Sequence, residues 1–99
     1  MITIVTIQQR VAASFGLPLL EMSSARRGGG VARARQVAMY LARELTPASF
    51  PQIGRAFDRD HTTSLHACTR IADLMAADPT FRDQVNVIRE QLEAVPDEW

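Results

Sequence analysis

Apolar residues recur every three or four positions along almost the whole chain, and this spacing constrains the fold more than any other feature. The clearest stretch is the last one, in which Phe81, Val85, Ile88, Leu92 and Val95 share one face of a helix. Strict alternation of apolar and polar residues, which is typical of a half-buried strand, does not extend beyond the first few positions. The sequence therefore predicts an all-α fold, with residues 1–99 forming a single domain.

Glycine, proline and capping residues divide this pattern into separate helices. Thr3 or Thr6 is a candidate cap for a first helix that ends at Gly16. The glycine run at 28–30 carries too much backbone entropy for a regular element, so residues 23–30 are predicted to form a loop. The remaining elements are expected at 19–22 (a short turn), 31–45, 49–57, 60–77, and from 78–79 up to Pro96.

The apolar residues also predict which faces are buried. The residues expected to pack inward in the short turn are Leu19, Leu20 and Met22. Those expected to form the inner stripe of the helix over 60–77 are Leu65, Cys68, Ala72 and Met75. Cys68 is the single cysteine, so we expect a small buried side chain, no internal disulfide and a reducing compartment. The N-terminus lacks the features of a signal peptide, and no apolar run approaches the length of a membrane span, so we expect a cytoplasmic protein.

The charges are balanced in number but not in position. All 11 bases are arginines, which excludes the lysine-dependent phosphate loop of a P-loop ATPase and also Schiff-base chemistry. Residues 1–57 hold seven arginines and two acids, whereas residues 58–99 hold four arginines and nine acids. Five arginines and no acid fall within 26–43. This asymmetry indicates a surface that faces a polyanion.

No constellation of catalytic or metal-binding residues emerges from the sequence. The spacing of His61, His66 and Cys68 on a helix points the three side chains in different directions, so they do not converge on one ion. Asp60, Ser64 and His66 likewise do not line up as orienter, nucleophile and base. We expect no enzyme activity, no catalytic residue, no metal and no cofactor.

Residues 49–77 have the organisation of a helix-turn-helix: a short helix, a tight turn at 58–60 and a long helix. The first turns of that long helix present short hydrogen-bonding groups, together with threonine methyls that can meet thymine methyls in a major groove. These groups are Asp60, His61, Thr62, Thr63 and His66. Taken alone, this pattern leaves open a capped surface helix in a small bundle.

Two motifs carry a more specific resemblance. The run VARARQVAMYLARELT over 31–46 and the run DHTTSLHAC over 60–68, in this order and spacing, resemble the C-terminal DNA-binding domain (domain IV) of the bacterial replication initiator DnaA family. The resemblance covers about residues 3–95. It implies a small helical bundle with a helix-turn-helix, similar to that of the Trp repressor, and binding to double-stranded DnaA boxes of the form TTATCCACA.

The resemblance also implies roles for individual residues. Arg27 matches an arginine that enters the minor groove over the A·T-rich end of the box, and Pro51 matches a residue that touches thymine methyls. The residues that match contacts to base edges in the major groove are Asp60, His61, Thr62 and Thr63. Those that match phosphate contacts, which set the register on the duplex, are Arg35, Gln36, Arg43 and His66.

Three positions depart from the pattern of the family. Glycines at 28–30 replace polar and basic residues of the loop, Ala34 stands where proline is common, and the turn at 58–60 is one residue shorter and lacks the usual glycine. Aspartate tolerates a left-handed backbone better than most residues, but Asp58 adds a negative charge near the phosphates. We expect a more flexible loop and box recognition at reduced affinity.

The family's initiator proteins carry an ATPase domain ahead of the DNA-binding domain. The start at Met1 and the tail over 96–99, which we expect to be disordered, favour a stand-alone protein over a piece cut from a longer one. The resemblance to a lone DNA-binding domain implies a monomer, and the absence of a P-loop implies no nucleotide binding. Such a protein is expected to act in origin recognition, or to regulate replication initiation or transcription by competing with the full-length initiator for sites. The alternative is a protein-interaction module that keeps the fold but has lost specific DNA binding.

Overall fold

The helices begin and end close to where the sequence predicts them. A computed structural model describes residues 1–94, and all of its regular elements are helical. Val95 and the predicted stop at Pro96 and tail at 96–99 lie outside the described residues. No helix within 1–94 has both the length and the apolarity that crossing a bilayer requires. The elements are α1 (Ile4–Ser14), the short 3-10 helix η1 (Leu19–Met22), α2 (Val31–Leu45), α3 (Phe50–Ala56), α4 (His61–Ala77) and α5 (Pro79–Glu93).

Side-chain caps account for the starts of four of these helices. Thr3 Oγ1 accepts a hydrogen bond from the Thr6 amide, which selects the first of the two predicted caps for α1. Ser49 and Gln52 form the predicted capping box at α3. Asp60 caps α4, and Asp78 caps α5 ahead of Pro79.

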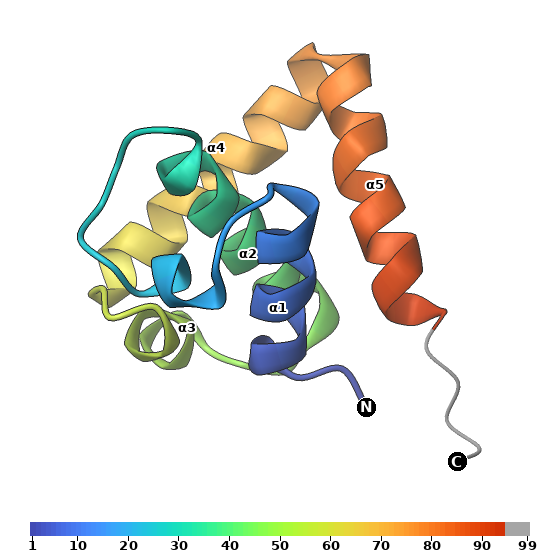
Figure 1. Cartoon of the computed structure of the whole chain (residues 1–99). Coiled ribbons are helices and arrows are strands. Elements are labelled where there is room, and N and C mark those ends of the chain that lie inside the picture. The colour runs from blue at the N-terminus through green and yellow to red at the C-terminus, as the bar shows by residue number, and fades with distance from the viewer. Residues whose placement is uncertain (95–99) are drawn as a thin grey trace.

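Helix α2 is the centre of the bundle (Figure 1). It contacts α1, η1, α3 and α4, while α3 and α4 pack against each other as the two helices of the helix-turn-helix. Helix α5 folds back from the end of α4 and contacts both α4 and α1. The loop between η1 and α2 extends from the same side of the bundle as the start of α4 (Figure 1). This arrangement leaves the first turns of α4 and that loop next to each other and uncovered.

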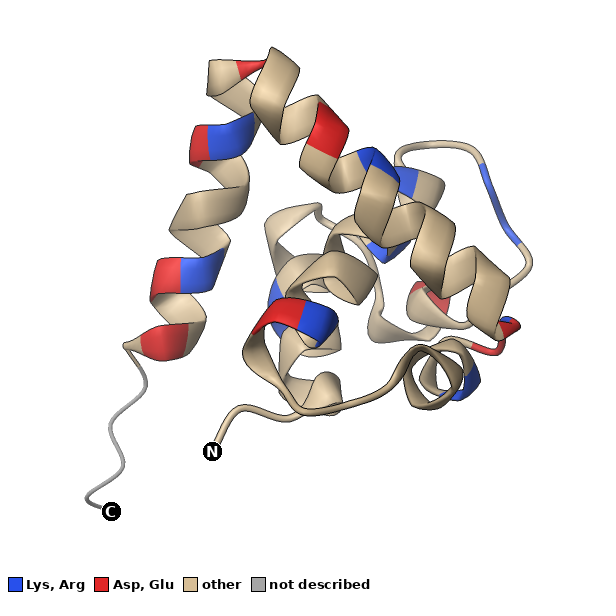
Figure 2. Cartoon of the chain, turned by 180° about the vertical axis from the view of Figure 1, so that it is seen from behind, with Lys and Arg blue, Asp and Glu red and all other residues tan. Residues whose placement is uncertain are grey.

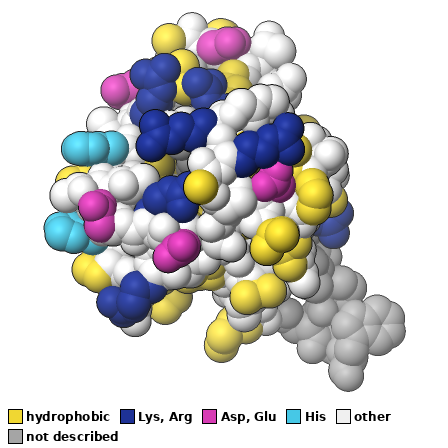
Figure 3. Space-filling view, turned by 60° about the vertical axis from the view of Figure 1, so that its left-hand side comes forward, with side chains coloured by type: hydrophobic (Ala, Val, Ile, Leu, Met, Phe, Trp, Pro, Cys, Tyr) yellow, Lys and Arg dark blue, Asp and Glu magenta, His cyan; other side chains and the backbone are white. Residues whose placement is uncertain are grey.

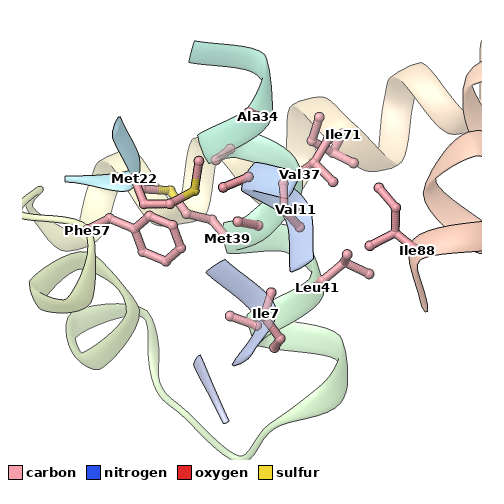
Figure 4. Packing of buried hydrophobic residues seen from close by; sticks show 14 of the residues in the cluster. Ile7, Val11, Met22, Ala34, Val37, Met39, Leu41, Phe57, Ile71 and Ile88 are labelled. Atoms are coloured by element: carbon pink, nitrogen blue, oxygen red, sulfur yellow. The ribbon is translucent and has the colours of Figure 1, made fainter. Parts of the chain in front are cut away.

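The core is apolar and continuous across the bundle. Residues from α1, η1, α2, α4 and α5 point toward one another in its interior, and Phe57 at the end of α3 closes one side (Figure 4). Burying this set provides the main driving force for the fold. The largest fully buried side chains are Phe57, Ile7, Met22, Met39, Leu41, Ile53, Ile71 and Leu92.

The predicted inner stripe of α4 is wrong by one position. Ser64, Ala67 and Ile71 are the buried residues of this helix, whereas Leu65 is 42% exposed. Small side chains at the first two positions allow α4 to lie close against α2 and α3. The Ser64 hydroxyl is satisfied there, because it donates to the Phe50 carbonyl at 3.0 Å. The buried face of α4 is therefore the one whose small side chains allow close packing, and not the one with the larger Leu65.

Two further predictions need correction. In η1 only Met22 of the three predicted apolar residues is buried, because one short turn presents a single face to the core; Leu20 is 77% exposed. Cys68 is half-buried and not fully enclosed, and its thiol donates to the Met39 carbonyl at 3.6 Å. Burial raises the pKa of Cys68 to about 11, so this thiol stays protonated near neutral pH.

Candidate nucleic-acid interface

The start of α4 is an exposed and internally hydrogen-bonded cluster. Asp60 Oδ1 accepts from the Thr63 amide at 3.1 Å, from the Thr62 hydroxyl at 2.6 Å and from the Thr63 hydroxyl at 3.2 Å. Asp60, His61, Thr62 and Thr63 are all exposed. Three donors from Thr62 and Thr63 therefore converge on one oxygen of the exposed Asp60 carboxylate. The predicted cap is confirmed, and the cluster keeps groups suited to base edges.

The hydrogen bonds at Asp60 also set its charge. Those from the Thr62 side chain and then the Thr63 amide lower the pKa of the Asp60 carboxyl below its ordinary value. The group is therefore a carboxylate near neutral pH, able to accept hydrogen bonds and unable to donate them. An acceptor of this kind suits the amino group of cytosine or adenine.

The turn between α3 and α4 is tight for two reasons. Asp58 adopts the left-handed conformation with φ of 56°, which aspartate tolerates better than most residues. Gly54 lets the turn approach α3 closely: a Cβ at this position would lie 2.6 Å from the Arg59 carbonyl oxygen and 2.9 Å from that of Asp60. The sequence analysis missed this role of Gly54. The signal that could have revealed this role is a glycine inside a short helix, four residues before a tight turn.

A positively charged hollow of about 380 Å³ lies beside these residues. It is formed by α2, α4, the turn before α4 and the loop before α2, and its lining includes four arginines and no acid. Figure 3 shows arginine side chains gathered on this face, with histidine side chains near them. The lining residues are Arg27, Ala32, Arg35, Gln36, Met39, Arg59, Thr63, His66, Ala67 and Arg70.

Five of the residues predicted from the sequence therefore meet in one place. Arg27, Arg35, Gln36, Thr63 and His66 come from a loop and two helices, and all five line the hollow. The hollow is not lined by Asp60, His61 or Thr62, although these residues directly follow the turn that carries Arg59. Pro51, exposed in the first turn of α3, and Arg43 do not line it either.

Arg35 is buried, which the sequence did not predict. Only 5% of the residue is exposed, and its guanidinium donates to the Glu21 carbonyl at 2.8 Å and to the Arg26 carbonyl. Burial, followed by the nearby charge of Arg59, lowers the pKa of Arg35. In the free protein Arg35 thus holds the loop before α2 against that helix, in addition to lining the hollow.

The first half of that loop is also held by an ion pair. Arg26 Nη1 lies 2.7 Å from Glu21 Oε2, and the Glu21 side chain is largely buried. Hydrogen bonds with the side chains of Ser24 and Arg26 lower the pKa of Glu21. At the other end of the loop, Gly30 has a φ of 82° just before α2 begins, a conformation that favours glycine.

Arg43 occupies a separate position at the end of α2. Its guanidinium carbon lies 4.5 Å from the centre of the Phe50 ring, and its Nη1 donates to the Ala48 carbonyl at 3.1 Å. This stacking places a cation beside Phe50, the first residue of α3 and the neighbour of Pro51 in the sequence. The side chain remains exposed and retains further N–H donors.

No acidic residue lines the hollow, although the exposed Asp58 and Asp60 lie in and after the turn beside it. Acidic residues alternate with Arg82 and Arg89 along α5, whereas the charged positions of the loop before α2 are all basic (Figure 2). Helix α5 does not contribute to the lining of the hollow. The hollow takes two of its arginines, Arg27 and Arg35, from the basic half of the sequence and two, Arg59 and Arg70, from the acidic half.

Two arginines of the hollow were not among the predicted site residues. Arg70 lies on the same face of α4 as Thr63 and His66, so helical spacing was sufficient to find it. Arg59 carries no such signal, because its position depends on how the turn meets the loop. Its Nη2 donates to the Ser24 carbonyl at 2.6 Å, across 35 residues of sequence.

The chain matches known proteins over the region that contains this site. Residues 4–71 match the family described as bacterial dnaA protein helix-turn-helix. The chain is 50% identical over 93 residues to the chromosomal replication initiator protein DnaA of Gluconobacter oxydans, covering 93% of this chain and 19% of the relative. The DnaA proteins of Sphingopyxis alaskensis and Rickettsia canadensis are 50% identical over 92 residues and 42% identical over 93 residues. These alignments cover 92% and 93% of this chain, and 20% of each relative.

The matched family region begins with α1 and ends within α4, so it includes all of α3, the first part of α4 and all four arginines that line the hollow. The chain spans about a fifth of the length of these relatives. The match covers the DNA-binding helix-turn-helix and no ATPase domain. The chain belongs to the bacterial DnaA helix-turn-helix family.

Proposed function

We propose that this chain binds double-stranded DNA at DnaA-box sites of the TTATCCACA type. The observation that carries the proposal is the junction of the exposed start of α4 with a hollow lined by four arginines and no acid. A surface of this kind offers short groups for base edges beside cations for phosphates, which is the division of labour in specific DNA binding.

In the proposed complex, the start of α4 enters the major groove. Asp60, His61, Thr62 and Thr63 face base edges, and Pro51 contacts thymine methyls from α3. The exposure of all five residues supports these roles. A helix-turn-helix places the first turns of its second helix in this groove.

The loop before α2 supplies the second contact. Arg27 is exposed and adjoins the hollow, and we place its side chain in the minor groove over the A·T-rich end of the box. A narrow A·T-rich minor groove has a strong negative potential that attracts a guanidinium. The phosphates between the two grooves then meet Gln36 and His66 in the hollow, with Arg43 serving a phosphate near α3. Arg35 contributes positive charge from its buried position.

The relatives are named as chromosomal replication initiator proteins, and this supports a role in replication initiation. We propose that the chain acts at replication origins or at regulatory boxes, in the bacterial cytoplasm and as a monomer on each box. These 99 residues hold no lysine and therefore no P-loop lysine. The proposed activity of the chain is to occupy boxes, in competition with a full-length initiator.

Fluorescence anisotropy tests the proposal directly. The protein is titrated onto a labelled duplex with one TTATCCACA box, and onto a scrambled duplex of equal composition, at about 0.15 M salt. We expect a preference of about 10³ or more for the box, as in other specific binders. Affinity for both duplexes should also fall steeply with added salt.

Equal and weak binding to the two duplexes would overturn the proposal. In that case the fold serves a protein partner, and the arginine-rich face is the surface to screen for it. Retention of four groups suited to base edges at the start of α4 favours DNA over that alternative, because a protein-binding scaffold does not require this chemistry.

A further inference from the structure

We infer that Arg59 is a positioning residue that ties the turn of the helix-turn-helix to the loop that carries Arg27. This inference rests on the proposed function and deepens it, since it concerns how the two groove contacts are held relative to each other. Arg59 immediately precedes Asp60, the cap of α4. Its guanidinium reaches across to the other DNA-facing segment.

The contacts of Arg59 are all to backbone carbonyls. Its Nη2 donates to Ser24 at 2.6 Å, while its Nη1 donates to Phe57 at 3.2 Å and to Asp58 at 3.0 Å. The planar guanidinium therefore bridges two segments that are far apart in the sequence. A residue with one flexible donor group cannot reproduce this fork in a fixed geometry.

The Ser24 carbonyl is a sensitive point in the loop, since it lies three residues before Arg27. The carbonyls on either side of it, those of Glu21 and Arg26, are held by Arg35 from α2. Arg59, which lies in the turn before α4, anchors the same part of the loop through the Ser24 carbonyl. Beyond Arg27 the chain continues into three glycines, two of them with positive φ, so the second half of the loop contributes little stiffness of its own.

The consequence concerns two contacts that must form together. A minor-groove arginine adds most to affinity when its position relative to the recognition helix is set before binding, because less ordering is then left to occur on the DNA. Arg59 joins the residue before the recognition helix to the base of the Arg27 loop, and so fixes this relationship in the free protein. Loss of the Arg59 side chain should therefore remove most of the contribution that Arg27 makes to the affinity for the box.

A direct phosphate contact by Arg59 predicts a different result, since Arg59 also lines the hollow. Removing a phosphate contact weakens binding to every sequence alike, and lowers the salt slope by about one. Removing an anchor of the Arg27 loop weakens binding to the box and reduces discrimination only at its A·T-rich end. It also has little effect once Arg27 is absent.

The binding test uses Arg59→Ala, Arg27→Ala and the double variant, with Arg82→Ala on α5 as the matched control. We expect Arg59→Ala to weaken box binding about tenfold, from the usual value of hydrogen bonds to charged groups. In the Arg27→Ala background the same change should cost less than about twofold. Discrimination against G·C pairs at the A·T-rich end should fall in both single variants, while discrimination at the other end is kept.

A second test needs no DNA. Amide hydrogen exchange is measured at Ser23 and Arg26, whose amides donate to the Leu20 carbonyl and to Ser24 Oγ. Arg59→Ala should speed exchange at these two positions, and leave amides in the centres of α2 and α5 unchanged. Arg59→Lys keeps the charge but loses the fork, so it should keep the wild-type salt slope while Ser23 and Arg26 still exchange faster.

The inference is wrong if the losses in the double variant add, or if Arg59→Ala weakens box and scrambled duplexes equally and lowers the salt slope. Unchanged exchange at Ser23 and Arg26 would overturn it as well. Failure of the wild-type protein to prefer the box is a separate result: it overturns the proposed function, while the exchange experiment still decides whether Arg59 anchors the loop.

Discussion

The Asp60 carboxylate accepts a hydrogen bond from the Thr63 amide at 3.1 Å, so one residue both caps α4 and presents a charge at its exposed start. The same oxygen also accepts from the hydroxyls of Thr62 and Thr63. The same carboxylate thus stabilises the start of α4 and holds the Thr62 and Thr63 side chains that we propose to contact bases.

This relationship predicts a pH dependence. Hydrogen bonds from Thr62 and then Thr63 lower the pKa of Asp60 in the folded state, so its stabilising effect is complete above the unfolded value of about 3.9. The effect is lost as the pH falls through the lower folded value. Melting temperatures measured between pH 6 and pH 3 should show this loss in the wild type.

Asp60→Asn is the matched control, because asparagine caps helices well but does not titrate in this range. The gap between the two melting curves should close as the pH falls. Asp60→Ala should lower the melting temperature at all these pH values, since it removes the cap. A wild type and an Asp60→Asn variant with parallel curves would contradict the assignment.

Thr63→Ala and Arg43→Ala should separate base reading from phosphate binding. Thr63→Ala should cost about 1–3 kcal/mol on the box and relax specificity, as loss of a good base contact does. Arg43→Ala should weaken all duplexes alike and reduce the salt slope by about one, because Arg43 is an exposed cation. Titrations at several salt concentrations measure both effects, and identical behaviour of the two variants would refute this division of roles.

Arg35→Ala should destabilise the protein itself. The substitution leaves the Glu21 and Arg26 carbonyls without their buried donor, which should lower the free energy of unfolding by about 2–3 kcal/mol. Arg10→Ala, at an exposed position of α1, should change it by less than about 0.5 kcal/mol. Urea denaturation measures both, and equal midpoints for the two variants would show that Arg35 acts only toward DNA.

Gly54→Ala should be the more harmful of two glycine substitutions. Its Cβ would lie 2.6 Å from the Arg59 carbonyl oxygen, so the turn must move, at an expected cost of about 1–3 kcal/mol. Gly28→Ala meets no atom within 4 Å and has no positive φ, so it should be neutral or stabilise by up to about 1 kcal/mol. Thermal unfolding compares them, and a stable Gly54→Ala protein would argue against the tight turn.

The boundaries of the helices could be predicted from the sequence because their causes are local. A cap such as Ser49 or Asp78 acts within the first turn of its own helix, and a glycine run or a proline ends an element without help from distant residues. The left-handed backbone at Asp58 also has a local cause, since aspartate tolerates this conformation better than most residues. The two motifs that resemble the DnaA family also lie within single helices, so they were readable before any packing was known.

The inner face of α4 was misjudged for the opposite reason. Helical spacing leaves two adjacent stripes open, and the choice between Leu65 and Ser64 depends on how closely α4 approaches α2 and α3. The size of an apolar side chain suggests burial, but only the distance between helices decides whether that side chain fits.

The sequence by itself determined the all-α class, the helix limits, the helix-turn-helix and the basic half of the chain, since each follows from residues within a few positions of one another. Only the tertiary structure decided that Arg35 is buried and that Arg59 reaches Ser24 across 35 residues. It also decided that Arg70 joins Arg27 in one hollow. These are relationships between segments distant in the chain, and a guanidinium shows no local preference for solvent, carbonyl or phosphate until packing places one of them within reach.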